Sequence, residues 1–206
     1  MGLTWSAMQL NRRQKSACLQ LAEASVRWGL HRREAPSAGD LEVDAVPTDR
    51  RASFVSLYIE DELNGCMGQL EPTRPLADDI VSNAYGAAFR DPRFPRPQTE
   101  DLGAMRLEVS ILSAWESVPA ATRREAKAAL EPGRHGVVLR RGRQRGTFLP
   151  SVWEMCPDPD RFLDALMKKA GFEQASWSGD IDVFRYEAER LEGQSFGDAS
   201  SEVSDP

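Results

Sequence analysis

A single cysteine stands between two glycines in the stretch Leu63–Gly68, which reads LNGCMG. A thiol acts as a nucleophile when a nearby base or cation favours its thiolate form, and glycines beside it can expose backbone N–H groups to an anion. Cys66, flanked by Gly65 and Gly68, is therefore the first candidate catalytic residue. Free cysteine is also among the residue types most often buried, so a packed and inert Cys66 remains the alternative.

Three further residues carry side chains suited to acid–base chemistry or anion binding. His135 precedes a glycine at the start of a predicted strand, where it is either a base near neutral pH or a turn residue. Glu108 occupies a polar position of an alternating strand, where it is a base only if that face lines a cleft, and otherwise solvated or ion-paired. Arg93, within Asp91–Pro95, either presents a guanidinium to an anionic ligand or belongs to a segment that ends a helix.

The densest basic cluster lies in residues 140–145, which contain four arginines. Such a cluster can bind phosphate groups, but no aromatic residue interleaves with it before Phe148, which disfavours stacking on single strands. The net charge of −6 gives no support either way, because residues 187–206 hold six acidic residues against one arginine and leave only −1 for the rest. The sequence favours a solvated hairpin tip, with nucleic-acid binding through Arg140–Arg145 as a weaker hypothesis.

Composition excludes several classes of protein. No apolar run approaches the roughly 20 residues of a membrane span, and residues 1–10 lack the pattern of a signal peptide. The three cysteines are widely spaced without a C-x-x-C pair, and the chain has two histidines. These features predict a cytoplasmic protein without membrane association, disulfide framework, metal site or cofactor.

The hydrophobic periodicity predicts helices and strands in irregular order. Asn11 and Gln14 form a capping box at the start of the first helix, and Gly29 is positioned to end it. The predicted helices are 11–29, 75–90, 121–130 and 158–171, and the predicted strands are 53–59, 63–70, 105–112, 136–141, 145–149 and 181–186. Because the strands occur as hairpins and singles, we expect an α+β fold with a mainly antiparallel sheet flanked by helices.

Three segments follow from this pattern. Residues 1–9 form a flexible N-terminus, residues 10–191 form a single domain, and residues 192–206 form an acidic tail. We expect the tail to be disordered, because its Gly, Ser and acidic composition cannot offset the entropy of ordering.

Motifs in a fixed order resemble the AMMECR domain family, the protein A component of the AmmeMemoRadiSam system. The family hallmark is the hexapeptide Leu-Arg-Gly-Cys-Ile-Gly after a strand and turn, which corresponds to Leu63–Gly68 here. The other matching segments are Ala88–Pro95, Leu107–Leu112, His135–Leu139, Thr147–Glu154 and Lys169–Phe172, followed by the last strand through Tyr186. The resemblance covers about residues 10–190, and several ordered motifs are more specific than one short pattern.

The resemblance implies a fold with a larger and a smaller lobe and a functional site at the hexapeptide. It places the substrate-binding positions at Glu62, Asn64, Gly65, Gly68 and Arg93. It also implies a radical SAM enzyme and a Memo-type protein as partners, and an unknown small molecule as ligand. The chain departs from the hallmark at Asn64 and Met67, and asparagine has neither the charge nor the bidentate fork of arginine.

Besides the weaker hypothesis of nucleic-acid binding, two functions remain open from the sequence. The first is a small-molecule-binding, enzymatic component of a modification pathway, with its cleft built around Cys66. The second is a non-enzymatic adaptor in which the hexapeptide is structural. A cleft with polar groups converging on Cys66 favours the first, and a filled site beside a flat apolar patch favours the second.

Overall fold

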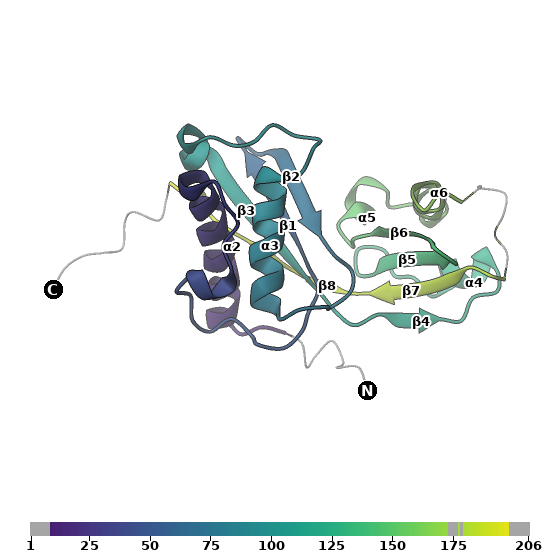
Figure 1. Ribbon diagram of the computed structural model, residues 1–206. Helices are drawn as coiled ribbons and strands as arrows, with labels where there is room; N and C mark the ends of the chain where they lie inside the picture. The colour runs from purple at the N-terminus through teal and green to yellow at the C-terminus, as the bar shows by residue number, and fades with distance from the viewer. Residues whose placement is uncertain (1–8, 173–176, 178, 198–206) are drawn as a thin grey trace. The chain divides into compact units, whose positions relative to one another are not determined.

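The computed structural model describes residues 9–172, 177 and 179–197, and Figure 1 shows its ribbon. The described chain forms two compact units. The larger unit contains residues 9–112 and 189–197, and the smaller unit contains residues 113–188. Most of the predicted N-terminus and of the predicted tail, residues 1–8 and 198–206, lie outside the described residues.

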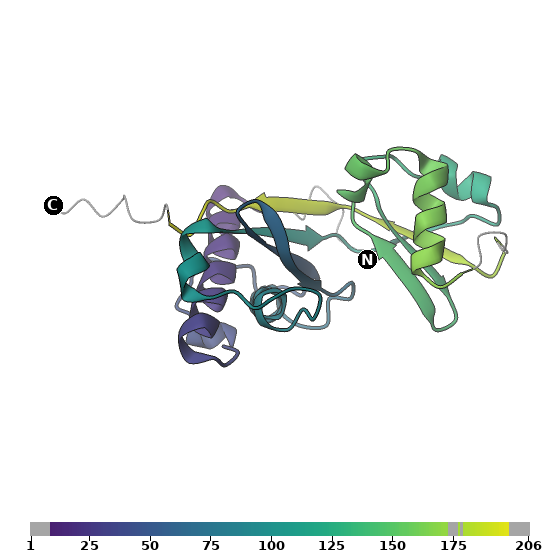
Figure 2. The same cartoon turned by 90° about the horizontal axis from the view of Figure 1, so that it is seen from above.

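The larger unit packs two long helices on one face of a four-stranded sheet (Figures 1 and 2). The strand order is β2-β1-β3-β8, and β1 pairs antiparallel with both β2 and β3. Its elements are α2 (Arg12–Arg32), η1 (Ala38–Asp40), β1 (Ser53–Ile59), β2 (Glu62–Gly68), α3 (Leu76–Phe89), η2 (Thr99–Ala104), β3 (Met105–Leu112) and β8 (Ala188–Glu192). Apolar residues of both helices and of β1 and β3 form one continuous core.

The predicted capping box of Asn11 and Gln14 is confirmed, but the predicted end of the first helix is wrong. The helix continues past Gly29 and ends at Arg33, which adopts a left-handed conformation with φ 59°. Gly29 serves the packing of α2 on α3, because a Cβ there would lie 2.8 Å from Cζ of Phe89. The glycine therefore marks a close approach of two helices and not a helix end.

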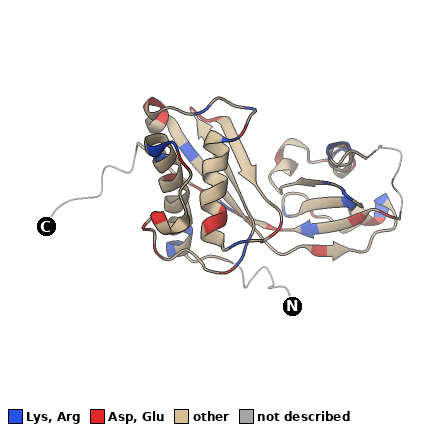
Figure 3. Ribbon diagram, viewed as in Figure 1, with Lys and Arg blue, Asp and Glu red and all other residues tan. Residues whose placement is uncertain are grey.

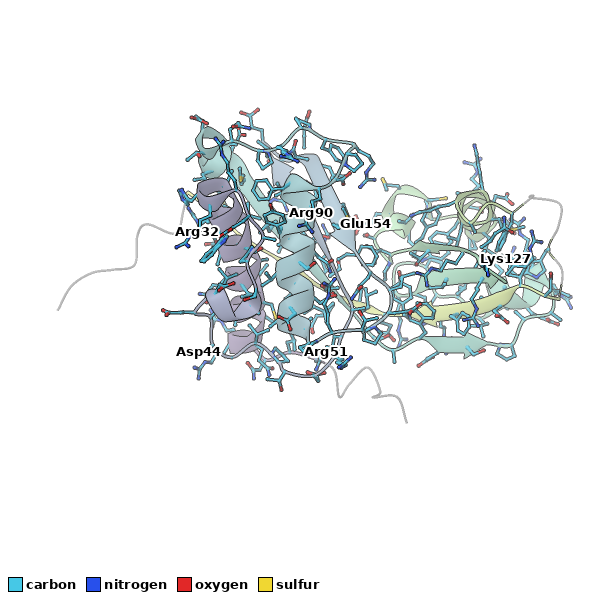
Figure 4. All side chains as sticks on the ribbon, in the orientation of Figure 1. Arg32, Asp44, Arg51, Arg90, Lys127 and Glu154 are labelled. Atoms are coloured by element: carbon cyan, nitrogen blue, oxygen red, sulfur yellow. The ribbon has the colours of Figure 1, made fainter. Side chains whose placement is uncertain are left out.

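The ends of the two helices carry arginines that cover aromatic rings of their own helix. The guanidinium of Arg32, in the last turn of α2, lies 4.0 Å from the ring centroid of Trp28. That of Arg90, the residue after α3, lies 4.9 Å from the ring of Tyr85; both arginines are labelled in Figure 4. Positive charge at these positions also complements the negative end of each helix dipole.

The first predicted hairpin is confirmed. Glu60 and Asp61 form its two-residue turn, both with positive φ (51° and 65°), as the twist of a tight hairpin requires. The β1–β2 register shifts between Leu57 and Tyr58, because Leu57 faces Gly65 while Tyr58 faces Leu63. Asn64 is therefore the extra residue of a β-bulge, a feature that the sequence pattern did not indicate.

The last described residues belong to the larger unit. Phe196 is 4% exposed in the core, and its N–H donates to the carbonyl of Met105 at 3.0 Å. Gly193 donates to Leu107 at 2.9 Å, and Arg27 donates to the carbonyl of Phe196 at 2.8 Å. The sequence instead predicted a disordered tail from residue 192, because a single phenylalanine among Gly, Ser and acidic residues gave too weak a signal.

The smaller unit packs its helices against a second antiparallel sheet, with strand order β4-β7-β5-β6. In its core the rings of Trp153 and Phe162 stack with centroids 3.6 Å apart. The predicted hairpin around Gly142 and the helix start at Asp158 are confirmed. The elements are β4 (Glu116–Val118), α4 (Arg123–Ala128), β5 (Gly136–Arg141), β6 (Gln144–Phe148), α5 (Val152–Met155), α6 (Pro159–Lys169) and β7 (Asp182–Tyr186).

Two antiparallel sheets with flanking helices confirm the predicted α+β class. The sequence missed the short strand β4 and the strand β8. It also made the helix at 121–130 too long, since α4 covers only Arg123–Ala128 after a capping box of Thr122 and Glu125.

Candidate functional site

Cys66 lies in the middle of β2, and its side chain is on the sheet face that the helices leave uncovered. Successive residues of a strand point to opposite faces. Val55 and Leu57 are fully buried in the helix-facing core, so Ser56 between them points to the open face. Cys66 is directly opposite Ser56 in the register and therefore shares that face.

Three polar residues follow one another across the open face. Cys66 on β2 pairs with Ser56 on β1, and Ser56 pairs with Glu108 on β3. Directly opposite residues of neighbouring strands have adjacent side chains on one face. The fold thus brings two of the predicted catalytic candidates, Cys66 and Glu108, onto one row with a serine between them.

Glu108 is buried, with 6% of the residue exposed, and it is ion-paired. Its Oε2 lies 2.7 Å from Nη2 of Arg190 on β8. Burial raises the pKa of the Glu108 carboxyl, and the nearby charge of Arg190 opposes that effect. The sequence left Glu108 as either a base or a residue without a catalytic role, and in the second case as solvated or ion-paired. Of these last two alternatives, the structure matches the ion pair.

Tyr58 extends the polar row along β1. Burial and the charge of Glu108 raise the pKa of its phenol, and the thiol of Cys66 is close enough to contribute in the same direction. The guanidinium of Arg106, directly opposite on β3, lies 4.4 Å from the centroid of the Tyr58 ring. We define the open-face cluster as Ser56, Tyr58, Cys66, Arg106, Glu108 and Arg190.

Arg93 reaches Cys66 from the loop after α3. It forms a bidentate pair with Asp91 (Nε to Oδ1 at 2.9 Å, Nη2 to Oδ2 at 2.6 Å) and also donates to the carbonyl of Cys66 at 3.2 Å. The N–H of Cys66 in turn donates to Oδ2 of Asp91 at 3.0 Å. Both backbone groups of the central cysteine are therefore held by the predicted Asp91–Pro95 segment.

The two glycines of the hexapeptide are explained by packing. A Cβ on Gly65 would lie 2.8 Å from the carbonyl carbon of Ala87 in α3 and even closer to its oxygen. A Cβ on Gly68 would overlap the ring of Phe54 and approach the Ser53 carbonyl oxygen to 2.6 Å. The close neighbours that these glycines admit are thus a helix and an adjacent strand.

Glu62 and Asn64, two further predicted substrate-binding residues, line a separate hollow of about 310 Å³ at the end of the β1–β2 hairpin. Pro95, Arg96 and Pro97 form its other wall. The amide of Asn64 donates to the carbonyl of Pro95 at 3.2 Å, so this side chain joins the hairpin to the loop. Cys66 is not part of this lining.

His135 belongs to the smaller unit, whereas Cys66 belongs to the larger one. Its Nδ1 accepts a hydrogen bond from the N–H of Glu131 at 2.9 Å, and its carbonyl accepts one from Nε1 of Trp153 at 2.7 Å. Burial lowers the pKa of the imidazole, aided by the charges of Arg185 and Arg134. The ring thus serves the turn before β5, the structural alternative stated for it from the sequence.

The family model AMMECR1 matches residues 19–191 of the chain. The chain belongs to the AMMECR1 family. Protein MK0488 of Methanopyrus kandleri is 36% identical over 149 residues, covering 70% of this chain and 72% of that protein. A protein of Methanosarcina mazei is 30% identical over 179 residues, covering 84% and 88%. The crystal structure of the uncharacterized protein PH0010 from Pyrococcus horikoshii aligns with a TM-score of 0.78 and 25% identity, covering 90% of this chain and 94% of that one.

Family membership confirms the resemblance derived from the hexapeptide and the ordered motifs. In this AMMECR1-family chain the position of the hallmark arginine is Asn64, the bulge residue of β2. Of the open-face cluster, the sequence missed Ser56, Tyr58, Arg106 and Arg190. The alternation of Ser53–Ile59 could have revealed Ser56 and Tyr58, because Ser56 lies between the buried Val55 and Leu57 and Tyr58 follows two residues later on the same face. Arg190 had no signal, since strand β8 was not predicted.

The arginine hairpin of the smaller unit is engaged in contacts within that unit. Arg140 pairs with Asp182 at 2.9 Å and lies over the ring of Phe184, and Arg141 lies over the ring of Phe172. Basic and acidic residues are interspersed on the strands and helices of this unit (Figure 3). These contacts support the solvated hairpin over a dedicated phosphate site.

Two features are absent from the described part of the chain. No helix there has the length and apolar character to cross a membrane. Within the same residues, no group of three or more histidine, cysteine, aspartate and glutamate side chains is placed to hold a metal ion.

Proposed function

We propose that the open-face cluster of the larger unit binds a small molecule and that Cys66 is its reactive group. The observation that carries this proposal is the row Cys66–Ser56–Glu108 across three strands, on the face without helices. The row places a nucleophile and a buried carboxylate on the same surface, with hydroxyl and guanidinium groups beside them. Nucleophilic, acidic and basic groups gathered on one surface are candidates for catalytic roles.

The spacing of the strands indicates where the ligand would lie. Neighbouring strands are about 4.8 Å apart, so Cys66 on β2 and Glu108 on β3 are two strand spacings apart, about 10 Å. At that separation the carboxylate cannot take the thiol proton directly. A small molecule above Ser56 would instead meet the thiol on one side and the carboxylate on the other.

The two groups then have different roles. Cys66, after losing its proton to water, would add as the thiolate to an unsaturated electrophilic carbon of the ligand, whose π electrons would move to the partner atom of the double bond. Glu108 would exchange a proton with the ligand, a task that its raised pKa suits better than the pKa of an exposed glutamate. The phenol of Tyr58 and the guanidinium of Arg106 would orient polar groups of the ligand.

The resemblance to the AMMECR domain family supplies the proposed setting. The protein would act with a radical SAM enzyme and a Memo-type protein in a modification pathway. We also propose a cytoplasmic location, since all three cysteines are free, as expected in a reducing compartment.

Thiol reactivity tests the proposal directly. Iodoacetamide labelling, followed by mass spectrometry of the folded protein, would compare Cys66 with an ordinary exposed thiol. We expect Cys66 to be labelled faster than an ordinary exposed thiol. We expect the Glu108→Gln substitution to slow the labelling of Cys66 only when a bound ligand links the two groups. Cys156→Ser is the matched control, because Cys156 is also a partly exposed free cysteine but lies in the smaller unit.

A function-based readout completes the test. In cells that depend on the pathway, Cys66→Ser should abolish function with little change in melting temperature, while Cys156→Ser should retain it. Ordinary labelling of Cys66 together with a functional Cys66→Ser variant would refute the nucleophile.

A non-enzymatic adaptor is the second candidate, and two observations favour it. The space beside the two hexapeptide glycines is occupied by the protein's own α3 and β1, and Leu63 at the hairpin end is 42% exposed. In this case Cys66→Ser would leave partner binding intact, while Leu63→Asp would weaken it.

A further inference from the structure

Strand β2 is an edge strand, yet the backbone of its central residue is not free. Edge strands present a row of outward N–H and C=O groups that can pair with another chain. At Cys66 these groups are taken by Asp91, which accepts from its N–H, and by Arg93, which donates to its carbonyl. The two side chains thus occupy the position of a neighbouring strand residue.

The pairing of β2 with β1 shows that the backbone N–H and C=O of Cys66 point away from β1, toward the open edge of the sheet. Gln69 donates to the carbonyl of Ser53, so Ser53 and Gln69 form a hydrogen-bonded pair. Hydrogen-bonded and non-hydrogen-bonded pairs alternate along an antiparallel ladder, which makes Ser56–Cys66 a non-hydrogen-bonded pair with its side chains close together. Gly68 falls on the same outward set.

Asp91 and Arg93 form a preorganised ion pair, which we call the fork. Arg93 binds both oxygens of Asp91 and still reaches the Cys66 carbonyl with the same Nη2. The side chain of Asp91 is 2% exposed, whereas that of Arg93 is 62% exposed. The hydrogen bonds from Arg93 and from the Cys66 N–H hold the pKa of Asp91 well below its usual value, so the fork stays charged at neutral pH.

We propose that Asp91 and Arg93 are positioning residues for the Cys66 thiol. By holding both polar groups of the Cys66 backbone, they fix the direction of its side chain toward Ser56 and the open face. They also close the middle of β2 to the addition of another strand. The proposal deepens the function proposed above, since it assigns the element that orients the reactive group.

Amide hydrogen exchange, measured residue by residue with NMR, tests the fork without any reference to thiol chemistry. In Asp91→Asn, we expect exchange at the Cys66 N–H to rise about tenfold, because this N–H loses its charged acceptor. In Arg93→Lys, we expect a smaller rise, because the bidentate contacts that hold Asp91 in place are lost. Exchange at Gly68, on the same edge without the fork, should not change. Arg96→Lys is the matched control, because Arg96 is an exposed arginine of the same loop.

A second measurement separates a positioning role from a purely structural one. The rate of Cys66 alkylation is recorded against pH in a Cys156→Ser background, and its plateau at high pH reports access to the thiolate. We expect the alkylation rate at the plateau to be about tenfold lower in Arg93→Lys, because a displaced nucleophile loses its orientation. Arg93→Lys keeps the positive charge, so a change there cannot come from lost electrostatics, and it also carries the test if Asp91→Asn does not fold.

The outcomes are distinct. Faster amide exchange with an unchanged plateau would overturn the positioning role and leave the fork as a cap on the edge strand. Unchanged amide exchange in both variants would overturn the fork altogether. An unreactive Cys66 in the unmodified protein would refute the proposed function while leaving the amide result in force.

Discussion

Replacing Gly65 with alanine should destabilise the larger unit strongly. The new Cβ would lie 2.8 Å from the carbonyl carbon of Ala87 and even closer to its oxygen, whereas ordinary Cβ contacts lie at 3.4–4 Å. The Ala87 carbonyl of helix α3 would therefore have to move away from β2, by 1.4 Å at its oxygen to reach the 3.4 Å of an ordinary contact from 2.0 Å. A helix backbone cannot yield in the way that a flexible side-chain end can.

The geometry sets the size of the effect. Overpacking a close contact typically costs about 1–3 kcal/mol, and a backbone contact belongs at the upper end, so we expect a loss of about 3 kcal/mol. For a chain of this length that corresponds to a melting temperature lower by about 6–12 °C. Thermal and urea unfolding, followed by circular dichroism, measure both quantities.

Gly103→Ala is the matched control, because a Cβ at Gly103 meets no atom within 4 Å. Its free energy of unfolding should stay the same or rise by up to about 1 kcal/mol, since alanine restricts the unfolded chain. A Gly65→Ala variant as stable as this control would refute the account of the hexapeptide glycine as a packing residue.

Three further predictions follow from burial and charge. Burial raises the pKa of the Cys18 thiol to about 12, so iodoacetamide at pH 8 should label Cys18 only after unfolding, as mass spectrometry of the labelled peptides would show. A chain ended after residue 192 should be about 3–5 kcal/mol less stable in urea than one ended after residue 197, because only the longer chain keeps the buried ring of Phe196; equal stability would contradict its place in the core. Because Arg93 lowers the folded-state pKa of Asp91, their pair stabilises the protein above about pH 4 and is lost as the pH falls, so Asp91→Asn should cost about 1–3 kcal/mol at pH 7 and progressively less below pH 4. A cost that is independent of pH in urea titrations would contradict this sign.

The sequence predicted the α+β class and most helices and strands, because their apolar periodicity and caps act locally. It failed where a residue serves a distant neighbour. Gly29 has the pattern of a helix end, but it is required by Phe89 of another helix. Phe196 stands alone in an acidic segment, and its pocket is built by residues far away in the chain. Neither relation has a local signal.

The same limit applies to the candidate site. Cys66 and Glu108 were singled out by residue type, but their common row depends on Ser56, which only the strand register reveals. The fork of Asp91 and Arg93 was visible as a motif that ends a helix. Its hydrogen bonds to the backbone of Cys66 depend on β2 being an edge strand, and strand order is a property of the whole sheet.

Strand alternation divides the hexapeptide into two sets of residues with different tasks. Gly65 and Met67 face α3. Gly65 lies against the backbone of Ala87, and the side chain of Met67 lies against Gly86. Cys66 faces the other way, toward Ser56 and the open face. A constraint on Gly65 follows from the packing of α3, and one on Gly68 from its contact with β1, whether or not the protein has a reaction. The presence of the motif alone therefore cannot decide between an enzyme and an adaptor. The cysteine is the position at which the two hypotheses differ, because no packing requirement of α3 reaches its side chain.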